Sequence, residues 1–188
     1  LAEDASQLLE EVSDIAVDDD GAVYVLDSAT GVLHRFASDG TYLNVISSDR
    51  EILGDARGMD VDSQGDLWIA NTRGGDIVRI DRDGNVRART AIMPVQDSQP
   101  VDVAVDKDGT LYVVDARTAR LLHLNPDGEL LGAWALSPFN SADGAHLAMD
   151  ERGNIYVTQP EQGQVLALSS EGELTDIWSI MTDSSARR

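Results

Sequence analysis

Residues 102–128 read DVAVDKDGTLYVVDARTARLLHLNPDG, and in this stretch short β-branched runs alternate with turn sequences. The run 103–105 ends in a D-x-x-G turn, and the run 111–114 follows directly, a pattern typical of a β-hairpin. A third apolar run at 121–124 ends in the turn PDG, and a further run begins at Leu130. The stretch therefore predicts four short antiparallel strands joined by tight turns.

The same pattern occurs four times with a constant spacing of 44 residues. The spacing holds for a turn aspartate, two turn glycines and an aromatic residue. These columns are Asp18, Asp62, Asp106 and Asp150; Gly21, Gly65, Gly109 and Gly153; Gly40, Gly84, Gly128 and Gly172; and Tyr24, Trp68, Tyr112 and Tyr156. Four strands per repeat, apolar on both faces, predict an all-β fold in which each repeat is one blade of a β-propeller. We expect blades at 12–55, 56–99, 100–143 and 144–187, preceded by a connector or partial strand at 1–11.

The repeats carry a family resemblance. DIAVDDDGAVYVLDSATGVLHRFASDG (14–40) and residues 102–128 resemble NHL repeats, and GMDVDSQGDLWIANTRGGDIVRIDRDG (58–84) is similar to streptogramin-lyase and gluconolactonase-like propellers. The resemblance covers all four units and implies a ring that commonly has six blades. Three ways to complete it stay open: a closed ring of four, further blades in a longer parent chain, or a second copy of the chain as a homodimer.

Composition limits the partners. The net charge of −20 repels phosphate backbones and anionic membranes, which excludes nucleic acid as a principal ligand. No apolar run approaches the roughly 20 residues of a membrane span, so we expect no membrane insertion. Cysteine is absent, which excludes disulfides and thiolate chemistry.

The propeller topology predicts two unlike faces. We name the face with the D-x-x-G turns the turn face, and the face with the other connections the loop face. The turn aspartates are expected to accept backbone N–H bonds and the turn glycines to adopt positive φ. The loop-face connections differ among the repeats, which is typical of ligand-binding segments. They carry four arginines that would suit a carboxylate, a phosphate or sugar hydroxyls, unless acidic neighbours pair with them: Arg50, Arg57, Arg73 and Arg117.

One column favours a sharper hypothesis. Asp14, Gly58, Asp102 and His146 are equivalent positions just before the innermost strand, where NHL repeats usually have Gly. Asp14, Asp102 and His146 would meet at the mouth of the central channel and could hold Ca²⁺ or Zn²⁺. The alternative is structural: the two aspartates cap strand starts, and His146 contacts a neighbouring carboxylate.

Catalytic motifs are missing from the sequence. The resemblance implies a cation held by Glu, Asn and Asp in gluconolactonase-like propellers and by several histidines in amidating lyases, and neither set matches residue by residue. We therefore expect a non-catalytic binding or scaffold module that recognises a protein or glycan through its loop face, outside the cytoplasm. A metal-dependent lyase or lactonase using Asp14, Asp102 and His146 is the alternative, and a structural array that stacks or dimerises is a third.

Overall fold

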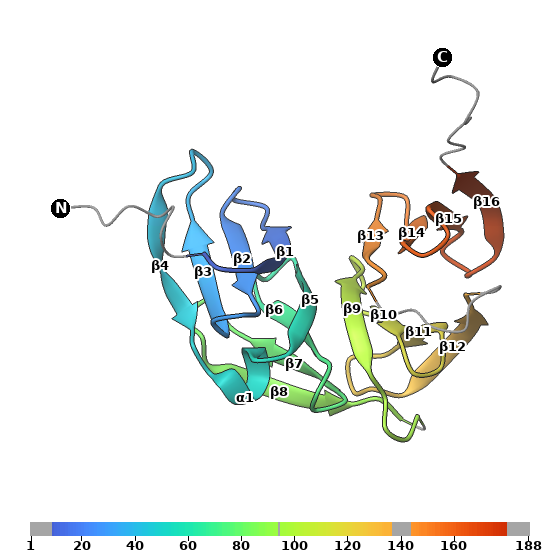
Figure 1. Ribbon diagram of the computed structural model, residues 1–188, viewed down its shortest axis with the longest axis horizontal. Coiled ribbons are helices and arrows are strands. Elements are labelled where there is room, and N and C mark those ends of the chain that lie inside the picture. Colours follow the sequence, from blue (N-terminus) through green and yellow to red (C-terminus); the bar gives the residue numbers. More distant parts are fainter. Residues whose placement is uncertain (1–8, 94, 137–143, 180–188) are drawn as a thin grey trace, which may run out of the picture.

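The computed structural model describes residues 9–93, 95–136 and 144–179. These residues form four separate four-stranded antiparallel sheets, each made of four consecutive strands (Figure 1). The predicted all-β class, the four blades and the four strands per blade are therefore confirmed. The predicted blade boundaries stay a prediction, because segments 1–8, 137–143 and 180–187 lie outside the described residues.

Each blade runs from an inner strand to an outer strand. Blade 1 contains β1 (Val12–Val17), β2 (Val23–Asp27), β3 (Val32–Phe36) and β4 (Tyr42–Ser47). Blade 2 contains β5 (Ala56–Val61), β6 (Leu67–Asn71), β7 (Asp76–Ile80) and β8 (Val86–Ala91). Blade 3 contains β9 (Pro100–Val105), β10 (Leu111–Asp115), β11 (Arg120–Leu124) and β12 (Leu130–Ala135). Blade 4 contains β13 (Leu147–Met149), β14 (Ile155–Gln159), β15 (Gln164–Leu168) and β16 (Leu174–Ser179).

A short helix that the sequence pattern did not predict, α1 (Arg50–Leu53), lies between blades 1 and 2. The Asp49 side chain caps it by accepting a hydrogen bond from the Glu51 N–H. Ile52 and Leu53 are buried in the core between the two blades. The helix therefore closes one interblade core from the loop face. In the described ranges, no helix is long and apolar enough to cross a membrane.

The four blades form a fan around one axis. The inner strands pack in order, β1 beside β5, β5 beside β9 and β9 beside β13. Figure 1 shows blades 1 and 4 at opposite ends of this fan, with the side between them open. The four described blades therefore build an open arc of a propeller.

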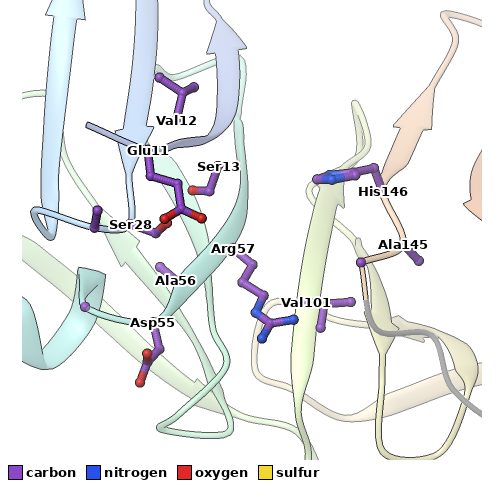
Figure 2. A pocket seen from close by; sticks show the side chains of 13 residues that line it. Glu11, Val12, Ser13, Ser28, Asp55, Ala56, Arg57, Val101, Ala145 and His146 are labelled. Atoms are coloured by element: carbon purple, nitrogen blue, oxygen red, sulfur yellow. The ribbon is translucent and has the colours of Figure 1, made fainter. Parts of the chain in front are cut away.

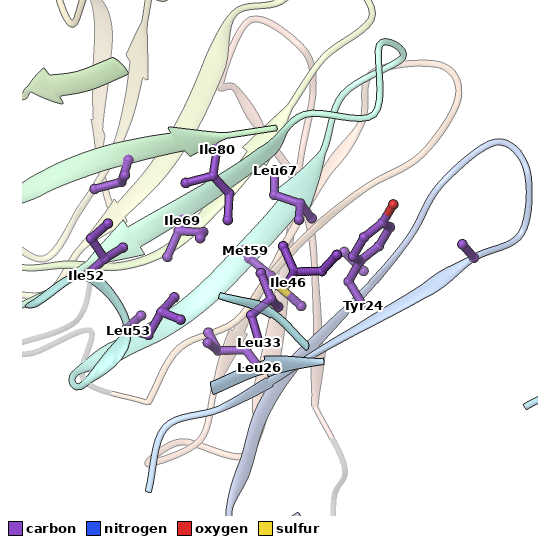
Figure 3. Packing of buried hydrophobic residues seen from close by; sticks show 14 residues of the cluster. Tyr24, Leu26, Leu33, Ile46, Ile52, Leu53, Met59, Leu67, Ile69 and Ile80 are labelled. Carbon is purple, nitrogen blue, oxygen red and sulfur yellow. The ribbon is translucent and has the colours of Figure 1, made fainter. Parts of the chain in front are cut away.

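The apolar core lies between consecutive blades. We name the blade surface that carries the aromatic column the front face, and the opposite surface the back face. At the first interface, Tyr24, Leu26 and Leu33 on the front of blade 1 pack against the back of blade 2 (Figure 3). The blade 2 residues in this contact are Met59, Leu67, Ile69, Val78 and Ile80. Two further clusters repeat the arrangement between blades 2 and 3 and between blades 3 and 4.

The turn face has the predicted local structure. Asp18 accepts hydrogen bonds from the backbone N–H groups of Asp20 (3.1 Å) and Ala22 (2.9 Å). Asp62, Asp106 and Asp150 accept the equivalent bonds in the other blades. The first turn glycine of the four repeats has φ of 80°, 81°, 80° and 82°, a region that favours Gly. These residues are structural.

Candidate binding site

The loop face contains a pocket of about 500 Å³ where the inner ends of the blades meet (Figure 2). Blade 1 contributes Ser13 and the β2–β3 connection, blade 2 contributes the start of β5, and blades 3 and 4 contribute one wall. Its residues are Glu11, Val12, Ser13, Ser28, Ala29, Gly54, Asp55, Ala56, Arg57, Val101, Gly144, Ala145 and His146. A pocket of this volume is large enough for a small polar ligand or a side chain of a partner.

His146 and Asp102 form a pair at the edge of this pocket. The imidazole Nδ1 of His146 lies 3.6 Å from Oδ2 of Asp102. Asp102 is 2% exposed, whereas the His146 side chain is half-exposed. The buried carboxylate also accepts hydrogen bonds from the N–H groups of Val103 (2.8 Å) and Leu147 (2.7 Å). Asp102 thereby joins β9 to β13 and holds His146 at the mouth.

Asp14 makes the same bridge one interface earlier. Its Oδ1 accepts the N–H of Ile15 at 2.9 Å, and its Oδ2 accepts the N–H of Met59, on the inner strand of blade 2, at 2.7 Å. Burial raises the pKa of the Asp14 carboxyl to about 7, and repulsion from Asp102 acts in the same direction. The two backbone hydrogen bonds and His146 oppose this rise.

Asp102 and His146 have shifted pKa values at the mouth of the channel. Burial raises the pKa of Asp102. The contact with Asp102 raises the pKa of His146, since a carboxylate stabilises the imidazolium form. His146 is therefore a cation over more of the neutral pH range than an ordinary histidine, and it presents that charge to the pocket.

Gly58 is the remaining member of this column, and its lack of a side chain has a structural reason. A Cβ at Gly58 would collide with the carboxylate and the Cα of Asp102. The inner strands β5 and β9 approach closely at this point, so the presence of Asp102 in blade 3 requires Gly in blade 2. Gly58 thus leaves the space that the Asp102 side chain occupies.

The contacts of Asp14 and Asp102 bear on the predicted metal site without testing it. Within the described ranges, no group of three or more His, Asp or Glu side chains is arranged to hold a metal ion. The carboxylate oxygens of Asp14 and Asp102 instead accept backbone N–H groups, as in the structural alternative. Binding of Ca²⁺ or Zn²⁺ by Asp14, Asp102 and His146 stays a prediction.

The four predicted arginines lie on the loop face, but the structure brings only Arg57 to the pocket. Arg50, in α1, donates a hydrogen bond from Nη2 to the Ala29 carbonyl oxygen at 3.2 Å. Arg73 forms an ion pair with Asp55, and Arg117 lies 3.7 Å from the carboxylate of Asp97. Acidic neighbours therefore compensate two of the four arginines, as the simpler alternative expects.

Asp60 is a structural residue whose role the sequence did not predict. Its carboxylate accepts the N–H groups of Val61 and of Val105, on the inner strand of blade 3, both at 2.8 Å. Burial raises its pKa to about 6. Asp60 thus bridges blades 2 and 3 as Asp14 and Asp102 bridge the other interfaces. A signal was present in the sequence, because Asp60 replaces an alanine found in the other three repeats.

Comparison with known proteins supports the class that the fold defines, a β-propeller. Residues 98–124 match the family model of the NHL repeat. No sequence among the curated proteins matches the chain.

Solved structures show the same fold. Virginiamycin B lyase from Staphylococcus aureus is 18% identical, with a TM-score of 0.66, over 90% of this chain and 55% of the lyase chain. Its catalytically inactive His-to-Ala variant with quinupristin is 18% identical, with a TM-score of 0.68, over 91% of this chain and 56% of the variant chain. A chain of the nidogen/laminin complex is 21% identical, with a TM-score of 0.73, over 93% of this chain and 65% of that chain. The chain thus spans between half and two thirds of the length of these proteins, and at such identities the likeness concerns the fold.

Proposed function

We propose that the chain is a non-catalytic binding module that recognises a carboxylate group of a protein or glycan in the loop-face pocket. The observation that carries the proposal is the placement of two cationic side chains in one pocket. Figure 2 shows Arg57 and His146 extending into the space between the blades from opposite walls. Two nitrogen-bearing groups on facing walls suit a carboxylate, which can accept hydrogen bonds on both oxygens.

The net charge limits the ligand. A chain with a net charge of −20 repels polyanions at long range, whereas a ligand with one carboxylate loses little from this repulsion. Glu11 and Asp55 also line the pocket and would disfavour additional negative charges. The proposal therefore concerns a single carboxylate, such as a peptide C-terminus or an acidic sugar. The nidogen/laminin neighbour supports protein recognition by this fold, and we retain the extracytoplasmic location as part of the proposal.

Matched probe pairs test the proposal. Sialyllactose is compared with lactose, and an acetylated tetra-alanine acid with its C-terminal amide, by titration calorimetry at pH 6 and pH 8. We expect one acid probe to bind and its neutral counterpart not to bind. Binding should weaken from pH 6 to pH 8, because His146 loses its proton as the pH rises through its raised pKa.

Two arginine variants give a matched control. Arg57→Gln removes a charge that lines the pocket, whereas Arg117→Gln removes an exposed loop-face charge outside it. Loss of one charge-assisted hydrogen bond is expected to weaken the acid probe about ten-fold or more in Arg57→Gln. The Arg117→Gln variant should bind as the original chain does. Equal binding of acid and neutral probes, or an equal effect of both substitutions, would contradict the proposal.

A metal-dependent lyase or lactonase is the second candidate, and the His146–Asp102 pair is the observation that favours it. Such a dyad can orient an imidazole as an acid or base. Elemental analysis of the purified chain, before and after dialysis against Zn²⁺ or Ca²⁺, separates the candidates. An equimolar metal that is lost in His146→Ala would support the enzyme. A metal-free chain that binds an acid probe would support the binding module.

A further inference from the structure

The loop-face pocket carries charged groups of both signs. Arg57 and His146 supply the positive groups, and Glu11 and Asp55 supply the negative ones. Arg73 forms an ion pair with Asp55 and compensates the charge of that carboxylate. Within the described ranges, the carboxylate of Glu11 forms no ion pair and accepts no hydrogen bond. Glu11 therefore presents an anionic group to a ligand in this pocket.

The backbone that carries Glu11 is held in place, although the side chain itself is exposed. The N–H of Glu11 donates to Oδ1 of Asp27 at 3.2 Å, and the N–H of Ser28 donates to the Glu11 carbonyl oxygen at 3.1 Å. Asp27 is fully buried at the end of β2. Figure 2 shows Glu11 on the opposite side of the space from His146. A ligand between the two would meet an anion at one end and a cation at the other.

The apolar part of the pocket offers little contact area. It consists of small side chains, which are those of Val12, Ala29, Ala56, Val101 and Ala145. Because the gain from apolar burial is proportional to the area buried, charged groups of the ligand must supply much of its affinity. Small lining residues also leave room for a ligand backbone with small substituents in the volume of about 500 Å³.

The net charge of the chain favours a ligand that has no net charge. At −20, the chain repels an anion at long range and attracts a cation. An ammonium group on the ligand offsets the repulsion that acts on its carboxylate. A zwitterion therefore approaches the pocket without an electrostatic penalty and brings a partner for each sign of charge in it.

We infer that the pocket binds a short peptide with free termini and small side chains. Its ammonium group binds Glu11, and its carboxylate faces Arg57 and His146. An ammonium group has three N–H donors and a carboxylate accepts on both oxygens, so each terminus suits the groups it meets. This inference rests on the proposed function, which supplies the carboxylate, and adds the ammonium group as a second requirement.

Four forms of one dipeptide test the inference by titration calorimetry at pH 6, where an α-amino group is charged. Alanyl-alanine carries both charges, its N-acetyl form only the carboxylate, its C-terminal amide only the ammonium group, and the N-acetylated amide neither. We expect alanyl-alanine to bind about ten-fold or more tightly than either singly charged form, because each of these lacks one charge-assisted hydrogen bond. The N-acetylated amide should not bind.

Two adjacent glutamates provide a matched pair of variants. Glu11→Gln removes the charge in the pocket, whereas Glu10→Gln removes an exposed charge that does not line it and changes the net charge equally. We expect Glu11→Gln to bind alanyl-alanine about ten-fold more weakly and the N-acetyl form as the original chain does. Glu10→Gln should bind every probe as the original chain does. Melting temperatures verify that both variants are folded.

The outcomes separate this inference from the proposed function. Equal binding of alanyl-alanine and its N-acetyl form, or an equal effect of both substitutions, would overturn the inference and leave carboxylate recognition standing. Equal binding of alanyl-alanine and its C-terminal amide would contradict both. A failure of alanyl-alanine to bind would overturn the inference, and binding of sialyllactose would then still support the proposed function. The probes on the original chain decide the question even if a variant unfolds.

Discussion

The turn face and the loop face of this propeller are built on opposite principles. On the turn face, four D-x-x-G turns have nearly the same φ at Gly and the same aspartate hydrogen bonds. On the loop face, one connection contains α1, the connections differ in sequence, and Arg57 and His146 line one pocket. Repetition on one face stabilises the blades, whereas the other face varies and contains the pocket proposed for binding.

The largest expected effect on stability concerns the turn face. Gly109→Val places a β-branched residue at φ of +80°, while nothing within 4 Å of its Cβ would clash. Backbone strain alone should therefore destabilise the fold, by about 1–3 kcal/mol. Urea denaturation measures the loss, with Gly109→Asn as the less strained control. If Gly109→Val unfolded at the same urea concentration as the original chain, this result would contradict the structural role of the turn face.

A smaller effect is expected from pH, because the fold raises the pKa of two carboxyl groups on the inner strands and lowers the pKa of two carboxyl groups at the turns. Asp14 and Asp60, on the inner strands, have pKa values raised to about 7 and about 6, so their folded forms bind protons more tightly than the unfolded chain. Their contribution to stability therefore falls as the pH rises from about 4 to about 7. Hydrogen bonds lower the pKa of Asp81 and Asp150 at the turns, and stability from these groups is lost as the pH falls below about 4.

Thermal unfolding between pH 3 and pH 8 measures both contributions. We expect maximal stability near pH 4–5, with a loss of stability toward neutral pH from each raised carboxyl. Asp60→Asn should flatten the slope between pH 5 and pH 7, whatever its effect on overall stability. A slope that is unchanged in this variant would show that Asp60 does not titrate in that range.

The sequence predicted what is local in this fold. The repeat predicted the strands and turns, since Asp18 and Gly21 satisfy their own turn within a few residues. The structural alternative for His146, a contact with a neighbouring carboxylate, agrees with its distance of 3.6 Å from Asp102. The interblade bridges were missed, because Asp60 lies in a different column from Asp14 and Asp102 and its partner is 45 residues away. The position of Arg57 in the pocket and the ion pairs of Arg73 and Arg117 likewise depend on contacts between connections that are distant in sequence.

The most direct test of binding at the loop face is to measure amide chemical shifts during titration with sialyllactose or with acetylated tetra-alanine acid. We expect shifts at pocket residues, including Ser28, Arg57 and His146, and none in the four D-x-x-G turns. On the opposite side, the inner strands and the turns surround a second cavity of about 950 Å³. Shifts confined to that cavity and its turns, with the pocket residues unmoved, would contradict the account.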